Sequence, residues 1–127
     1  MSAARNGRAM KAKGSAFERE VVRVLHEHGH PHAARAYGAG RPRDVGDISG
    51  VPGFAVEVKA CRSIDLSGWL DEAAREAANV GPSVLPVVVA KRRGHPPEDA
   101  YAVLRLSDFA ELVAARPPQE MTQEGGR

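Results

Sequence analysis

The sequence predicts an α/β fold in which a mixed central β-sheet is flanked by helices. Residues 16–28 and 66–78 carry apolar side chains at helical spacing. Residues 54–60 alternate between an apolar and a charged side, as a strand with one solvated face does. Residues 84–91 are rich in valine, which favours a strand covered on both faces. The order is therefore helix, three strands, helix, two strands, helix.

The first helix is expected from about Ala16 to His28, with Gly29 ending it. Ser15 and Glu18 have the spacing of a capping box, in which both side chains bond to the backbone at the start of a helix. At about 100° per residue, Glu18 also falls on the apolar side of this helix. Glu18 is thus either a capping residue or an inward-facing functional carboxylate.

Short strands and turns account for the segment between the first two helices. We expect one strand over residues 31–37, ended by a glycine-rich turn at residues 38–42. A second strand is expected around Asp47 and Ile48, and a turn at residues 50–53 leads into the strand 54–60.

The second half of the chain supplies the remaining elements. Strands are expected at residues 84–91 and 101–106, with a loop between them. Ser107 is expected to cap a last helix whose apolar face carries Phe109, Leu112 and Val113. That face is a candidate for an interface between subunits, or for covering the sheet of its own subunit.

A length of 127 residues with 43% hydrophobic content suits one domain. We expect it over residues 11–116, between flexible tails at residues 1–10 and 117–127. The longest apolar stretch, residues 84–90, is far shorter than the roughly 20 residues of a membrane helix, so no membrane association is expected. Cys61 is the only cysteine, and no secretory signal is visible, which together favour a cytoplasmic protein.

Glu57 and Lys59 are expected on the same face of one strand, because side chains two residues apart in a strand point the same way. Asp47 lies ten residues earlier, a suitable distance for a neighbouring strand joined by a turn. Two carboxylates held side by side repel each other unless a cation lies between them. Mg²⁺ is typically bound by one or two carboxylates together with phosphate oxygens and water. The pattern therefore predicts a Mg²⁺ site, with Mn²⁺ as an expected substitute, and Lys59 beside it as a positive charge for phosphate or an attacking water.

Each of these residues also has a simpler interpretation. Glu57 and Lys59 would form an exposed ion pair of little energetic value on a half-solvated strand, and Asp47 would be an ordinary turn residue. An aspartate, a ten-residue gap and Glu-x-Lys is by itself a weak pattern. The inward-facing Glu18 and the basic residues around these carboxylates favour the metal site, since basic groups attract a polyanion.

Four segments resemble, in order, the motifs of the archaeal-type Holliday junction resolvases and their phage relatives, which are nucleases of the PD-(D/E)xK superfamily with a restriction-endonuclease-like core. The segments are KGSAFERE at residues 13–20, RAYGAG at 35–40, GDI at 46–48 and VEVK at 56–59. The resemblance covers roughly residues 11–92.

The resemblance implies a site, a substrate and an assembly. The implied metal ligands are Glu18, Asp47, Glu57 and the backbone carbonyl of Val58, and the implied catalytic residues are the same three carboxylates with Lys59. The family works as a homodimer that cuts two strands of a four-way DNA junction. The residues expected to contact DNA, on the resemblance and on charge, are Lys11, Lys13, Ser15, Arg35, Arg41, Arg43 and Arg62.

Two departures from the family pattern bear on this interpretation. Several members have a serine where this chain has Ala39. The helix after the Glu-x-Lys strand often presents a glutamine near the site, where the nearest candidate here is Glu72 or none. Neither departure touches the nuclease interpretation, but both bear on the preference for junctions.

Three functions follow from the sequence. The first is a metal-dependent, structure-specific endodeoxyribonuclease, most closely a Holliday junction resolvase. The second is a nuclease on other branched, nicked or single-stranded DNA. The third is a non-catalytic DNA-binding module of the same fold, which a broken metal set would indicate; here all four site residues are present.

Overall fold

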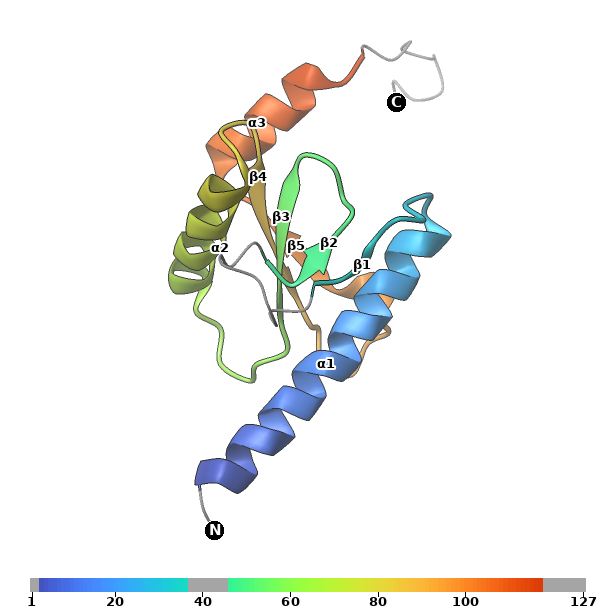
Figure 1. Ribbon diagram of the computed structural model, residues 1–127, viewed down its shortest axis with the longest axis vertical. Helices are drawn as coiled ribbons and strands as arrows, with labels where there is room; N and C mark the ends of the chain where they lie inside the picture. The colour runs from blue at the N-terminus through green and yellow to red at the C-terminus, as the bar shows by residue number, and fades with distance from the viewer. Residues whose placement is uncertain (1–2, 37–45, 118–127) are drawn as a thin grey trace, which may run out of the picture.

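The computed structural model describes residues 3–36 and 46–117, with side chains from residue 14 onwards (Figure 1). Its elements are α1 (Ala3–Glu27), β1 (Ala34–Arg35), β2 (Ile48–Ser49), β3 (Phe54–Lys59), α2 (Leu66–Val80), β4 (Leu85–Ala90), the 3-10 helix η1 (Pro97–Asp99), β5 (Tyr101–Val103) and α3 (Leu106–Ala115). This is the expected order, with η1 added in the loop before β5. The predicted α/β class is confirmed.

The five strands form one mixed sheet in the order β1-β2-β3-β4-β5. All neighbouring pairs are antiparallel except β3 and β4, which are parallel because α2 carries the chain back across the sheet between them. In the parallel register, Glu57 lies opposite Val88 and Lys59 opposite Ala90. The carboxyl ends of β3 and β4 therefore meet at the same edge of the sheet.

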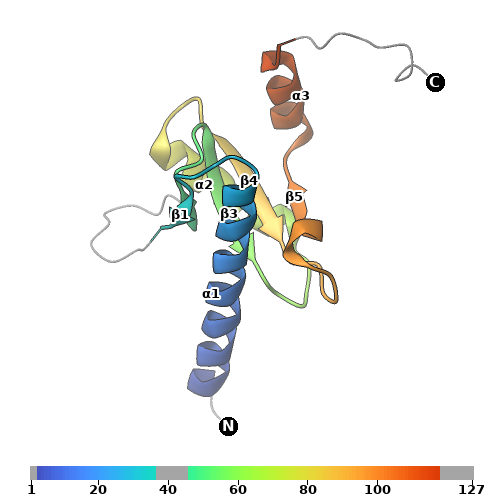
Figure 2. The same ribbon diagram turned by 90° about the vertical axis from the view of Figure 1, so that its right-hand side faces the viewer.

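The core has two layers, one on each face of the sheet. On one face, Phe17 of α1 packs with Val56 of β3. On the other face, Trp69 and Ala73 of α2 pack with Val88 of β4. Figures 1 and 2 show α1 and α2 beside the sheet, with the N-terminal part of α1 extending past it. Alternation along β3 therefore assigns each of its side chains to either the α1 face or the α2 face.

The start of α1 differs from the expectation. The helix begins at Ala3, thirteen residues before the expected start at Ala16, and residues 3–10 of the expected flexible tail are helical. These residues include three alanines and two arginines, which favour helices. Ser15 therefore lies inside the helix, and the prediction that it caps the helix together with Glu18 was wrong.

The burial pattern of α2 also differs in two places. Leu66, expected on the buried stripe, is 43% exposed because it stands in the first turn. Glu76, although it is charged, is only 2% exposed. It follows Trp69 by seven residues, which is two helical turns, so it lies on the same face as that buried side chain.

Other boundaries shift by a few residues. β1 covers only part of the strand expected at residues 31–37, and β5 ends at Val103. The expected cap of the last helix was wrong, because α3 begins at Leu106 and Ser107 is its second residue. The expected turn at residues 38–42 and the end of the C-terminal tail lie outside the described residues. Within the described ranges, no helix is long and apolar enough to span a membrane.

Candidate active site

Asp47 is held against β3 by two backbone hydrogen bonds. Its N–H donates to the carbonyl of Val56 at 2.8 Å, and its Oδ2 accepts from the N–H of Val58 at 2.8 Å. Gly46 makes this close approach possible, since its φ is +105° and a Cβ there would lie 2.9 Å from the Val56 oxygen. The Asp47 carboxylate is thus bonded to the neighbouring strand and not to its own turn.

The backbone of Val58 presents its carbonyl on the same side as Asp47. In a strand, the N–H and C=O of one residue point to the same neighbour, and those of the next residue point the other way. The Lys59 carbonyl accepts from Lys91 N–H on the β4 side at 2.9 Å, whereas the Val58 N–H donates to Asp47. The Val58 carbonyl therefore faces the Asp47 side, where the resemblance implies a metal ligand.

Glu57 and Lys59 share the face of β3 that α2 covers. The Lys59 Nζ lies 3.1 Å from Glu57 Oε2 and 3.0 Å from Glu72 Oε1 on α2. Only 6% of the Glu57 side chain and 18% of the Lys59 side chain is exposed. Glu57 and Lys59 therefore do not form an exposed surface ion pair. Glu72, the nearest candidate expected on this helix, does reach the site.

The protonation of Glu57 and Lys59 follows from this environment. Burial, together with the negative charges of Asp47 and Glu72, raises the pKa of Glu57 to about 7, although its interactions with Glu76 and Lys59 oppose the shift. Burial also lowers the pKa of Lys59, but its hydrogen bonds to Glu72 and Glu57 outweigh burial, and its pKa lies above the ordinary value. Lys59 is therefore a firmly held cation, and Glu57 changes charge near neutral pH.

Three carboxylates gather between β3 and α2. Glu57, Glu72 and Glu76 each place one oxygen within 4.8 Å of the others. Glu57 Oε1 is buried and has no hydrogen-bond partner among the described residues. Hard divalent cations take oxygen ligands of this kind. The oxygens around Glu57 are therefore of the kind that binds a divalent cation, although Glu57 is the one member of this cluster that the sequence predicts as a metal ligand.

Glu18 belongs to a second polar group, on the α1 side. Arg35 of β1 donates from Nε to Glu18 Oε1 and from Nη2 to Ser15 Oγ, both at 3.0 Å. The Glu18 and Arg35 side chains are about one-fifth exposed. The structure thus places Asp47, the residue before β2, against β3, which carries Glu57 and Lys59, while Glu18 is joined to two of the residues expected to contact DNA.

A cleft of about 810 Å³ opens at the carboxyl ends of β3 and β4. Four cationic side chains line it, from both strand ends and the loops after them: Lys59, Arg62, Lys91 and Arg93. We call this the basic cleft. Ligands of α/β proteins commonly bind at the carboxyl ends of parallel strands. Of the other residues expected to contact DNA, Lys11 and Lys13 lie on α1 without described side chains, and Arg41 and Arg43 lie outside the described residues.

Sequence reasoning missed Lys91, Arg93 and Glu76. A signal existed for the first two, because the basic run at residues 91–93 directly follows a buried strand, although which strand it neighbours is set by the fold. The signal for Glu76 was its seven-residue spacing from Trp69.

Comparison with known proteins shows a family to which part of the chain is similar. A family model described as archaeal Holliday junction resolvase (hjc) matches residues 9–67, which include all four predicted site residues. No curated protein and no solved structure matches the chain significantly. The mixed five-stranded sheet with three α-helices is consistent with the restriction-endonuclease-like fold of that family. Residues 9–67 of the chain are therefore similar to the archaeal Holliday junction resolvase family.

Proposed function

We propose that this protein is a divalent-metal-dependent endodeoxyribonuclease that resolves four-way DNA junctions. The observation that carries the proposal is the bond of Asp47 to the backbone of β3 next to Glu57, with the half-buried cation Lys59 beside Glu57 at the wall of the basic cleft. An aspartate, a glutamate and a lysine in this order along two strands suit the hydrolysis of a phosphodiester.

The metal would be held by Asp47, Glu57 and the carbonyl of Val58, with Glu18 as the fourth ligand that the resemblance implies. Mg²⁺ is the expected ion, and Mn²⁺ is expected to replace it. When bound, the metal lowers the pKa of a coordinated water and draws negative charge from a phosphate oxygen. For Glu18 to take part, one oxygen of its carboxylate would bind the metal; its Oε1 is paired with Arg35 at 3.0 Å.

Lys59 has a role that its charge determines. A lysine whose pKa lies above the ordinary value cannot take a proton from water near neutral pH. It instead supplies a fixed positive charge for the negative charge that develops on the phosphate. Its bonds to Glu57 and Glu72 hold the ammonium in position, so this charge does not have to be reorganised during the reaction.

The basic cleft would receive the DNA backbone. Arg62, Lys91 and Arg93 line it together with Lys59, so a phosphate in the cleft would lie next to the carboxylates. Arg35, which is paired with Glu18 and Ser15, is a further residue proposed to contact the DNA backbone. Contacts with phosphates are independent of base sequence, which suits an enzyme that recognises the shape of a junction.

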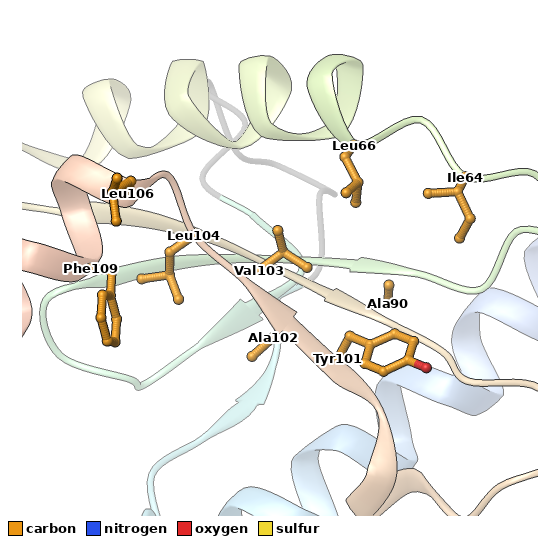
Figure 3. A pocket seen from close by; sticks show the side chains of 9 residues that line it. All are labelled: Ile64, Leu66, Ala90, Tyr101, Ala102, Val103, Leu104, Leu106 and Phe109. Atoms are coloured by element: carbon orange, nitrogen blue, oxygen red, sulfur yellow. The ribbon is translucent and has the colours of Figure 1, made fainter.

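A second copy of this chain is the proposed partner, since a four-way junction offers two-fold symmetry and two strands to cut. An apolar groove of about 710 Å³ runs between β5, the start of α2 and α3 (Figure 3). Figure 3 shows Leu66, Tyr101 and Phe109 along this groove. Leu106 is 81% exposed and Phe109 is 51% exposed, so α3 does not cover the sheet of its own subunit. Burying this face against its symmetry copy would remove an exposed apolar patch.

The test compares labelled four-way junction, flap and linear duplex of the same sequence as substrates. We expect cleavage of the junction in Mg²⁺, none with a chelator, and little cleavage of linear duplex. Cleavage of the flap in preference to the junction would instead favour a general nuclease of branched DNA. Binding of the junction without cleavage in Mg²⁺ or Mn²⁺ would favour a non-catalytic DNA-binding module.

A further inference from the structure

We propose that α2 adds a second cation position to this site, where one divalent cation is held by the carboxylates of Glu57, Glu72 and Glu76. The position lies on the α2 side of β3 and shares Glu57 with the position at Asp47. This inference rests on the proposed metal-dependent nuclease and extends it from one metal ion to two.

The geometry suits a small cation. The three carboxylates each offer an oxygen within 4.8 Å of the other two. Oxygens bound to one Mg²⁺ at about 2.0–2.1 Å lie within roughly 4.2 Å of one another. A small adjustment of side chains would therefore close the shell. Glu72 is partly exposed and lies at the open side of the cluster, so coordinated water and a substrate oxygen have a route to the remaining positions.

The second observation is the state of Glu57. Its Oε2 lies 3.1 Å from Lys59 Nζ, whereas its Oε1 is buried and has no hydrogen-bond partner within the described part of the chain. One of the two oxygens lies within 4.8 Å of an oxygen of Glu72 and of Glu76. A buried carboxylate oxygen without a donor is costly, and the usual remedies are a bound cation or a proton. Lys59 supplies a single positive charge to two of these carboxylates, Glu57 and Glu72. A divalent cation would supply the charge that is lacking.

The packing of α2 explains why two of its carboxylates reach β3. Glu72 and Glu76 are four residues apart and so share one face of the helix, where two like charges are unfavourable without a cation between them. Ala73 and Ala77 are buried beside them, and their small side chains let the helix approach the strand closely. Two-metal nuclease sites place ions about 3.5–4 Å apart and often share one carboxylate between them. Glu57 is positioned to be that shared ligand.

The alternative is that a proton alone bridges Glu57 and Glu76, and the exchange of Glu76 for glutamine distinguishes the two. Glutamine resembles a protonated carboxyl group in shape and can donate to Glu57, but it is a poor ligand for a divalent cation. The full chain without DNA is titrated with Mn²⁺, and the free ion is counted by electron paramagnetic resonance. We expect two ions per wild-type chain. Glu76→Gln should lose one ion, Asp47→Asn the other, and Glu57→Gln should weaken both.

The matched control is Asp71→Asn, which also replaces a carboxylate by an amide on α2 but at an exposed position; it should keep both ions. Thermal unfolding verifies that each variant folds. Should Glu76→Gln not fold, Glu72→Gln serves instead, and we expect it to weaken one ion at least tenfold. A single ion in the wild type, or two undiminished ions in both α2 variants, would overturn the inference. If only Asp47→Asn loses an ion, the proposed function stands without the second cation position. If the wild type binds no Mn²⁺, both the proposed function and the second position are wrong.

Discussion

The carboxylate of Asp47 accepts a hydrogen bond from the backbone N–H of Val58 at 2.8 Å. This bond fixes the aspartate against the β3 backbone at Val58, the residue that follows Glu57. Asp47→Asn keeps an oxygen that can accept from Val58, so the variant should fold. We expect it to lose cleavage by roughly a hundredfold or more through loss of metal, while it binds junction DNA as well as the wild type or better. Parallel cleavage and binding assays check this, and near-normal cleavage would remove Asp47 from the site.

Glu18→Gln separates a functional carboxylate from a structural one. Ser15 lies inside α1, so a helix cap no longer accounts for Glu18. The variant weakens a half-buried ion pair with Arg35, which should cost about 1 kcal/mol of stability or less. We expect folded protein with normal junction binding and strongly reduced cleavage, measured on the same labelled junction. Normal cleavage would mean that Glu18 serves only to hold Arg35.

The stability of the metal-free protein should depend on the ionisation of Glu57. Its pKa is about 7 in the folded protein and near 4.5 ordinarily, so between these pH values the folded state holds the extra proton. The free energy of unfolding should therefore fall as pH rises from about 4.5 to 7, by at most about 3 kcal/mol. Urea unfolding across this range, with chelator present, measures the slope.

Glu57→Gln provides the control for that slope. It has no proton to lose, so the fall in stability over this pH range should largely disappear. Added Mg²⁺ should oppose the fall in the wild type, because the metal binds the ionised carboxylate. If the wild type instead gains stability over the same range relative to Glu57→Gln, the pKa of Glu57 is not raised in the folded protein.

The basic cleft predicts which cationic side chains bind the DNA backbone. Replacing Arg62, Lys91 or Arg93 by glutamine should weaken binding to every junction sequence alike and reduce the slope of log K against log salt by roughly one unit each. Arg75→Gln, at an exposed position of α2 outside the cleft, is the control. The slope is obtained by measuring affinity at several salt concentrations. Three unchanged slopes would move the DNA surface away from the cleft.

The apolar groove predicts that two copies of this chain form a dimer. We expect a dimer in sedimentation at micromolar concentration, and Phe109→Asp should dissociate it, because a charge would be buried in the interface. Glu111→Gln changes an exposed charge on the same helix and should leave the dimer unchanged. In a supercoiled cruciform plasmid assay the dimer should linearise the circle by paired cuts. A wild-type monomer that only nicks circles would favour a general branched-DNA nuclease and leave the metal site as proposed.

The sequence by itself determined the order of the elements and the pairing of Glu57 with Lys59. Both follow from local periodicity: side chains recur every second residue in a strand and about every 3.6 residues in a helix. The strand at residues 54–60 and the helix from Leu66 needed little correction for this reason. The capping pattern at Ser15 does not mark the start of α1. The residues before Ser15 favour a helix, and α1 begins at Ala3.

Only the tertiary structure decided which distant residues surround that pair. The parallel register of β3 and β4 brings Lys91 to the end of β3. The crossover helix presents Glu72 and Glu76 to Glu57, and the packing of α1 on the sheet pairs Glu18 with Arg35. Each contact joins elements whose relative position depends on the packing of two buried layers. Periodicity along the chain specifies which face of an element is buried, but not which neighbour covers it.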